Sequence, residues 1–397
     1  METIPRELLT EVKSGNCVPF LGAGISTEAP FFKEHYGENF YDYIKRLSKQ
    51  RSRSRHLSFP DMMQYFCDKV DGGRKNRLIR EIIDWIEPFC FEGGNKRLMT
   101  IFHKEIARVP YFKIFVTTNW DIFCERALNV LVPMVEDRDI PFWDDSKRQI
   151  LKIHGCITRP HTIIATREDY EKCLTDRKNT ALFTKLRDLM ATKTFIFFGY
   201  SMSDPDFEII YDEVINNLGE FRRSSYVVDP TPNERTVIQW DKRGVKAVKM
   251  YGIAFLKEII RDLENNKIIP TEELITYFDL QRELIVEIHG KTCEKQNTDF
   301  GFISSMYQDG LLHALEHVLY KSQIGSDFNE FKKELDEEFL PLLNRYIKRR
   351  NSTEIAYYTG WVEVLNRLIN QNRRVLLPFL NPRTLRPTKF KKGLMNR

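Results

Sequence analysis

The chain has 397 residues, of which 42% are hydrophobic, 29% charged and 12% aromatic. This balance is typical of globular proteins and excludes collagen-like, disordered and coiled-coil classes. The 61 basic and 56 acidic side chains leave a net charge of only +5, which by itself does not indicate a nucleic-acid-binding protein.

Six short hydrophobic runs are predicted to be strands, and most alternate with segments of helical period. Several runs are apolar almost throughout, which is typical of strands buried on both faces of a parallel sheet. The runs lie at 18–21, 112–117, 150–153, 194–198, 225–228 and 245–250. The helical segments lie at 6–12, 77–86, 98–107, 120–131, 204–218 and 231–243. The alternation predicts an α/β fold with a Rossmann-like, doubly wound parallel sheet of about six strands.

One segment, from about 34 to 108, interrupts this alternation and is predicted to be a helical insertion that packs over one end of the sheet. Inside it, residues 45–56 carry six Lys or Arg and no acidic residue. Such a run is either a solvated face or a contact for nucleic acid or an acidic partner.

The last third of the chain changes to helices alone, at 272–288, 302–320, 328–349 and 353–370. We therefore expect two domains, 1–268 around the sheet and 269–397 built from helices. The basic tail that starts at Pro382 contains no acidic residue and is predicted to be an interaction arm.

The seven cysteines include no Cys-x-x-Cys pair and their number is odd, which argues against a disulfide framework or a four-cysteine zinc site. No apolar stretch approaches the roughly 18 residues that indicate a membrane span, and the N-terminus does not resemble a signal peptide. We expect a cytoplasmic protein that does not bind membranes.

A glycine-rich segment, Gly22-Ala23-Gly24-Ile25-Ser26, follows the first predicted strand. Glycines at this place let backbone N–H groups approach a pyrophosphate, and a helix N-terminus adds a favourable dipole. The simpler interpretation is a tight turn between a strand and a loop.

Two polar motifs follow the second and third predicted strands. In Thr117-Thr118-Asn119-Trp120-Asp121, Asn119 can orient water or a ribose hydroxyl, and Asp121 can accept hydrogen bonds or cap the next helix. In His154-Gly155, the imidazole is a candidate general base near neutral pH, or a histidine tied to the backbone of a turn. Cys156 and His161 are close by, but their spacing matches no usual zinc pattern.

Two further motifs follow the fourth and fifth predicted strands. Gly199 and Ser201 stand where a strand meets a helix, and Asp204 is a candidate N-cap. Asp229 ends the next strand and can hold a ribose hydroxyl. The alternative is that each of these residues only stabilises a turn of the backbone.

In order and context, these five motifs resemble those of the sirtuin family over roughly residues 15–250. That family carries Gly-Ala-Gly-x-Ser, Thr-x-Asn-x-Asp and His-Gly motifs, then a Gly-x-Ser turn and a strand on the adenosine side. The resemblance implies binding of NAD, with Asn119 and His154 as catalytic residues. The implied NAD contacts are Gly22, Ala23, Gly24, Ser26, Thr27, Thr118, Asp121, Gly199, Ser201 and Asp229.

The sequence departs from the protein-deacylating sirtuins at two places. The stretch 28–33 lacks their Asp-Phe-Arg element, and only Cys156 and Cys173 follow the His-Gly motif where those proteins have four zinc-binding cysteines. The resemblance therefore implies no zinc module and no complete acyl-lysine cleft. Water then remains as the nucleophile, and the expected reaction is hydrolysis of NAD to nicotinamide and ADP-ribose.

The pattern resembles the sirtuin-like branch of bacterial anti-phage systems, in which NAD depletion arrests the infected cell. It is most similar to the sirtuin-like subunit that pairs with a HerA-type ATPase. This implies control by homo-oligomerisation through the helical domain or by such a partner, with nucleic acid as a further partner of the basic segments. The alternatives are a non-catalytic NAD or ADP-ribose sensor and a protein deacylase without zinc.

Overall fold

The computed structural model describes residues 4–27, 37–49, 57–91, 100–173, 180–200, 205–294 and 298–378. Four features of the sequence lie outside these ranges: Ser201, Asp204, the stretch 28–33 and the basic tail. So do residues 50–56 of the basic segment. The chain divides into two compact units, Met1–Ile259 and Ile260–Arg397, whose boundary falls within helix α13 (Gly252–Asn265). The assignment of the predicted domains 1–268 and 269–397 to separate functions stays a prediction.

The first unit is built on one six-stranded parallel sheet with the strand order β3-β2-β1-β4-β5-β6, which confirms the predicted fold class. The strands are β1 (Cys17–Leu21), β2 (Ile114–Thr117), β3 (Gln149–Lys152), β4 (Thr194–Phe198), β5 (Ser225–Val228) and β6 (Val245–Val248). The order reverses between β1 and β4, and ligands of such sheets bind beyond the carboxyl ends of the strands at this switch point.

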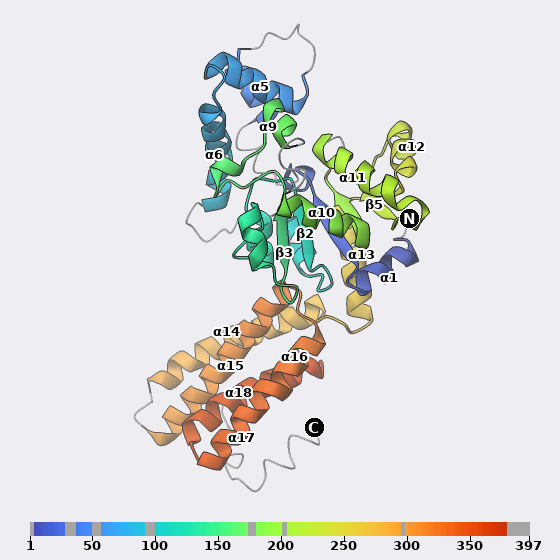
Figure 1. The fold of residues 1–397 in the computed structure, drawn as a ribbon. Coiled ribbons are helices and arrows are strands. Elements are labelled where there is room, and N and C mark those ends of the chain that lie inside the picture. The colour runs from blue at the N-terminus through green and yellow to red at the C-terminus, as the bar shows by residue number, and fades with distance from the viewer. Residues whose placement is uncertain are drawn as a thin grey trace. The chain divides into compact units, whose positions relative to one another are not determined.

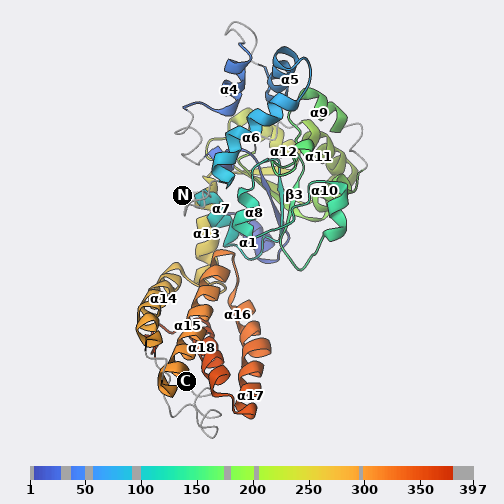
Figure 2. The same ribbon diagram turned by 90° about the vertical axis from the view of Figure 1, so that its left-hand side faces the viewer.

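Helices cover both faces of the sheet (Figures 1 and 2), because successive side chains of a strand point to opposite faces. On β4, Phe197 packs edge-on against Tyr211 of α11, whereas Phe198 packs against Phe102 of α7 and Phe255 of α13. Burial on both faces explains why β4 is apolar in four of its five positions. The helices that flank the strands are α1 (Arg6–Lys13), α7 (Ile101–Ala107), α8 (Phe123–Leu128), α10 (Ala181–Thr192), α11 (Pro205–Leu218) and α12 (Glu234–Lys242).

The insertion between β1 and β2 is helical where the structure describes it. It contains α4 (Phe40–Leu47), α5 (Phe59–Val70) and α6 (Asn76–Phe91). Its apolar side chains form a core of their own that also includes Phe123, Ile157 and Ile163. The insertion therefore packs on the loops that follow β2 and β3. A short helix, α9 (Arg167–Lys172), which the sequence analysis did not anticipate, lies beside α5 in both views (Figures 1 and 2).

The second unit contains helices and no strand among its described residues. Its long helices are α14 (Glu272–Cys293), α15 (Asp299–Gln323) and α18 (Ser352–Ile369). Between them, α16 (Phe328–Glu334) continues through a π-helical turn, Leu335–Phe339, into α17 (Leu340–Arg349). A separate hydrophobic core, with Phe278, Leu311 and Leu365 at zero exposure, holds these helices together.

Candidate functional site

The junction between β1 and β4 is formed by glycines in close contact. Gly22 N–H donates to the Phe198 carbonyl and Gly24 N–H donates to the Gly199 carbonyl, both at 2.9 Å. A Cβ atom on Gly24 would lie 2.7 Å from the Gly199 Cα, and Gly199 itself has φ of +58°. These positions need glycine because two backbones meet there. The two N–H groups hold the shape of the loop, and the contact of Gly22, Ala23 and Gly24 with a pyrophosphate stays a prediction.

The motif after β2 is joined to the glycine loop by side-chain hydrogen bonds. Asn119 Nδ2 donates to the Gly22 carbonyl at 3.3 Å and to Ser26 Oγ at 3.2 Å. Ser26 Oγ donates in turn to Asp121 Oδ2 at 3.2 Å. Thr117 supports this arrangement, since its hydroxyl donates to the Leu21 carbonyl and accepts from Asn119 N–H. Residues that are about 95 positions apart in the sequence therefore form one polar cluster.

Asn119 has one polar atom that this cluster leaves unsatisfied. Its Oδ1 is buried and has no hydrogen-bond partner among the described residues. Buried carbonyl oxygens of this kind are rare in folded proteins, and a bound ligand or water often explains them. The amide is fixed by its two donated bonds, so Oδ1 is an acceptor held in place for an O–H group.

Asp121 joins the polar cluster to the start of α8. Its Oδ1 accepts from Phe123 N–H at 3.0 Å, and α8 therefore begins at Phe123 rather than at the predicted residue 120. Burial raises the pKa of Asp121 above its ordinary value, although the charge of Lys152 and several hydrogen bonds oppose this shift.

His154 lies beside Asn119 at the same edge of the sheet. Thr117 and Lys152 are partners in the β2–β3 register, so Asn119 and His154 each stand two residues beyond that pair. The Thr117 carbonyl accepts from Ile153 N–H at 3.1 Å, and the Trp120 carbonyl accepts from Ile157 N–H at 2.9 Å. Asn119 is 9% exposed and His154 is 4% exposed. The structure thus brings the two predicted catalytic residues to neighbouring strand ends.

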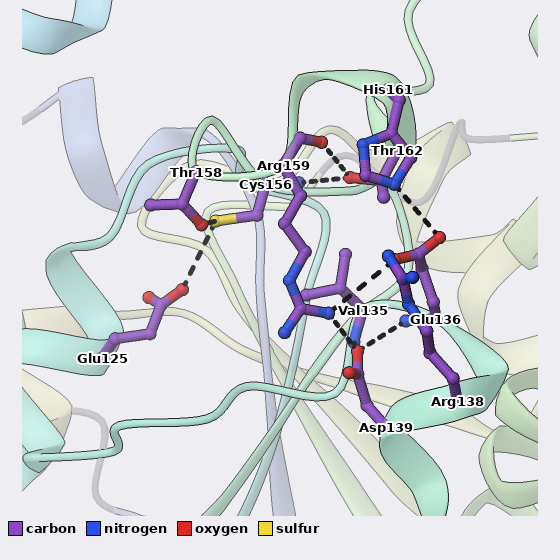
Figure 3. A network of polar contacts seen from close by, with 10 residues as sticks. All are labelled: Glu125, Val135, Glu136, Arg138, Asp139, Cys156, Thr158, Arg159, His161 and Thr162. Carbon is purple, nitrogen blue, oxygen red and sulfur yellow. Dashed lines mark hydrogen bonds and ion pairs between the residues drawn. The ribbon is translucent and has the colours of Figure 1, made fainter.

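The loop after His154 is fixed by a polar network (Figure 3). Gly155 has φ of +87°, and a Cβ there would lie 2.3 Å from the Thr162 carbonyl oxygen. Arg159 forms an ion pair with Asp139, which also accepts from two backbone N–H groups. His161 binds Glu136 at 3.2 Å at the outer end of the network. In the described structure His161 therefore contacts Glu136 at the surface rather than Cys156.

A buried ion pair lies beneath the motifs and was missed by the sequence analysis. Lys152 Nζ lies 2.8 Å from Glu125 Oε1 and also donates to the Asp121 carbonyl. Burial opposes the charge of Lys152, yet the attraction of Glu125 raises the pKa of this lysine above its ordinary value. A lysine among the apolar residues of the predicted run 150–153 was the sequence signal that could have revealed the pair.

Three further predicted residues that the structure describes, Thr118, Thr27 and Asp229, have positions fixed by local structure. Thr118 N–H donates to the Leu21 carbonyl, and Thr27 is the last residue of α2 (Gly24–Thr27). Asp229 N–H donates to the Val248 carbonyl, while its Oδ1 accepts from Thr231 N–H in a turn. The predicted roles of these residues toward NAD stay predictions.

The described residues show no metal cluster and no helix suited to a membrane. In those ranges, no group of three His, Cys, Asp or Glu side chains is arranged to hold a metal ion. None of the described helices combines the length and the apolar character that crossing a membrane requires.

The comparison with known families agrees with this geometry. Residues 113–248, which run from β2 to β6, match the SIR2-like domain. Over these residues the chain is similar to a SIR2-like domain. The glycine loop lies outside the matched range, but β1, the strand before it, pairs with β2 and β4 in the same sheet.

The similar curated proteins are named for NAD hydrolysis or for defence. NAD(+) hydrolase ThsA of Acinetobacter baumannii (strain 532279) is 24% identical over 228 residues, 56% of this chain and 44% of that protein. NAD(+) hydrolase ThsA of Bacillus cereus (strain MSX-D12) is 23% identical over 288 residues, 67% of this chain and 57% of that protein. Defense-associated sirtuin 2 of Bacillus subtilis is 22% identical over 351 residues, 76% of this chain and 33% of that protein.

The chain thus spans from about a third to just over half of the length of these relatives. The HerA-associated assignment made from the sequence has no counterpart among these names and stays a prediction.

Proposed function

We propose that the SIR2-like domain binds NAD+ and hydrolyses it to nicotinamide, ADP-ribose and a proton. The observation that carries this proposal is the buried Asn119 Oδ1, an unsatisfied acceptor at a strand end next to the one that His154 follows. The names of the similar proteins, NAD(+) hydrolase and defence-associated sirtuin, support the same reaction and a role in anti-phage defence.

In this mechanism the bond between nicotinamide and ribose breaks, and water forms the new bond to the anomeric carbon. Asn119 Oδ1 accepts a hydrogen bond from the attacking water or from a ribose hydroxyl. His154 takes the proton of the water and returns it to solvent. A positioned base of this kind typically contributes about 10² to 10⁴ in rate. Ser26 and Asp121 hold the Asn119 amide so that its acceptor stays in place.

The direct test follows ADP-ribose by chromatography and mass spectrometry after NAD+ is mixed with the purified protein. We expect His154→Ala and Asn119→Ala each to lower turnover at least about 10²-fold. His313→Ala is the matched control, because this histidine contacts Tyr357 in the helical unit. Equal activity of all three variants would contradict the proposed site.

The same assay separates the alternatives. Tight binding of NAD+ without any product would identify a sensor. Nicotinamide release only in the presence of an acyl-lysine peptide would identify a deacylase.

For the helical unit we propose contacts with further copies of the chain or with a HerA-type ATPase. Exposed apolar side chains on α14 and α15 support such contacts, among them Leu280, Val286 and Phe300. Light scattering of the purified chain, alone and with the ATPase, tests this. A monomer under both conditions would contradict it. The basic segments stay a predicted nucleic-acid contact, which a loss of affinity with added salt would support.

A further inference from the structure

The short helix α9 lies between His154 and the helical insertion. Its residue Tyr170 packs edge-on against His154, with ring centroids 5.2 Å apart and an interplanar angle of 75°. The Tyr170 hydroxyl lies 3.5 Å from His154 Nδ1. The His154 main chain is fixed separately, since its carbonyl accepts from Ile164 N–H at 3.0 Å. Tyr170 is thus placed to set the orientation of the imidazole rather than the path of its backbone.

The position of α9 is set partly by hydrogen bonds at its N-terminus. Thr166 and Asp169 form a capping box, in which Thr166 Oγ1 accepts from Asp169 N–H and Asp169 Oδ2 accepts from Thr166 N–H. This arrangement satisfies N–H groups at the helix start and fixes where the helix begins.

Two residues of the insertion hold α9 from the other side. Gln64 of α5 donates to Glu168 Oε1 at 3.3 Å and accepts from Glu168 N–H at 3.2 Å. Lys75 forms a 2.6 Å ion pair with Asp169 and also donates to the Ile163 carbonyl. Gln64 is buried, so the hydrogen bonds of its side-chain amide are shielded from water. Losing them would therefore cost free energy.

We propose that Tyr170 is a positioning residue for His154 and that Gln64 and Lys75 hold it there. This inference rests on the proposed function, in which His154 acts as a base. A neutral imidazole can accept a proton at Nε2 only when Nδ1 carries the other proton. The Tyr170 oxygen is the acceptor for that Nδ1–H, and it keeps the same hydrogen bond when Nε2 takes a proton from water. Tyr170 retains its own proton throughout.

The kinetic test uses Tyr170→Phe, which preserves the ring contact and removes only the oxygen. We expect kcat for NAD+ to fall about 10- to 100-fold, with KM unchanged, by analogy with the hydrogen-bond partners that orient metal-binding histidines. In a His154→Ala background the same substitution has no further effect. Tyr43→Phe is the control, because Tyr43 donates its hydroxyl to Glu81 within the insertion. A Tyr170→Phe effect that is absent, or equally large without His154, overturns the proposal.

A second readout does not depend on NAD hydrolysis. The chain has eight histidines, and His154 can be assigned in the spectrum of ¹⁵N-histidine-labelled protein by comparison with His154→Gln. We expect the wild-type His154 signal to show a protonated Nδ1 and an unprotonated Nε2, and the Tyr170→Phe signal to show a mixture of tautomers. An identical signal in both proteins overturns the positioning role. If the spectra differ as expected but no NAD+ is hydrolysed, the proposed function fails and the positioning role stands.

The contribution of the insertion is tested by Gln64→Ala. We expect it to lower kcat in the same direction as Tyr170→Phe and to shift the His154 signal toward the mixture. Arg167→Ala on the same helix is the control, because its ion pairs to Asp61 and Glu171 are exposed and 3.7 Å long. Unchanged kcat and spectrum in Gln64→Ala would overturn the part of the proposal that involves the insertion.

Discussion

At the scale of single residues, the buried His103 of α7 makes the stability of the fold depend on pH. Its side chain is 1% exposed, its Nδ1 lies 2.6 Å from Thr100 Oγ1, and the rings of Phe102 and Phe123 pack against it. Burial lowers the pKa of His103 to about 3. In the unfolded chain a histidine has a pKa of about 6.5.

This difference predicts that stability falls as the pH falls. Between about pH 6.5 and 3 the unfolded state binds a proton at His103 that the folded state does not, so the free energy of unfolding decreases as pH decreases. The expected contribution is at most about 1.4 kcal/mol per pH unit for this single proton. Urea unfolding between pH 7 and 5 measures it. His103→Gln should show a shallower pH dependence over this interval, and an unchanged slope would contradict the prediction.

The buried pair of Lys152 and Glu125 allows a second prediction at this scale. Lys152→Met should destabilise the first unit by about 3–5 kcal/mol, because it leaves the Glu125 carboxylate buried without its cation. In the double variant Lys152→Met/Glu125→Leu most of this loss should be recovered, since the uncompensated charge is gone. Urea unfolding of the three proteins tests this. A double variant that is less stable than Lys152→Met would contradict it.

At the scale of elements, two glycines allow α15 and α18 to pack closely. A Cβ on Gly310 would lie 2.0 Å from the Tyr357 carbonyl oxygen, and one on Gly360 would lie 2.6 Å from the Leu311 nitrogen. Gly310→Ala should therefore destabilise the helical unit by about 1–3 kcal/mol, because the two helices must separate.

Gly290→Ala in α14 is the matched control for this prediction. A Cβ at that position would meet no atom within 4 Å, so the change should stabilise the helix by up to about 1 kcal/mol. Thermal unfolding followed by circular dichroism compares the two variants. Equal shifts of both melting temperatures would show that packing between α15 and α18 does not decide the effect.

The strands were predicted well because their pattern is local. All six lie within a few residues of the predicted ranges, since burial on both faces gives a run of Val, Ile and Phe that a single sequence displays. The predicted helix starts were less accurate where a side-chain hydrogen bond sets the first residue of the helix. The start of α8 depends on the hydrogen bond from Phe123 N–H to Asp121, which hydrophobic periodicity does not show.

The candidate site was predictable only in part, for a related reason. Asn119 and His154 follow strand ends, so the topology of the sheet brings them together. Tyr170 stands on a six-residue helix without an apolar face, and its contact with His154 depends on the fold of the intervening loop. Glu125 likewise could not be predicted from the sequence, because its role depends on the contact with Lys152 that the fold creates.

At the scale of the whole molecule, each unit has its own hydrophobic core. In the first unit one core contains Phe197 of β4 and Leu186 of α10, besides the core of the insertion, and the core of the second unit contains Phe278 and Leu311. All proposed ligand contacts lie in the first unit. A ligand stabilises the part of a protein that binds it, by about 2.7 kcal/mol at a concentration of 100 Kd.

We therefore expect ADP-ribose to protect the first unit selectively from hydrogen exchange. Peptides that contain residues 22–26, 117–121 and 154–157 should exchange more slowly at saturating ADP-ribose, because their backbone amides surround the proposed site. Peptides from α15 and α18 should be unchanged in the same sample, which provides an internal control. Protection confined to α15 and α18 would place the nucleotide site in the helical unit and would contradict the assignment to the edge of the sheet. The Asn119→Ala variant should lose most of the protection at 117–121, since it lacks the acceptor that we place against the ribose or its water.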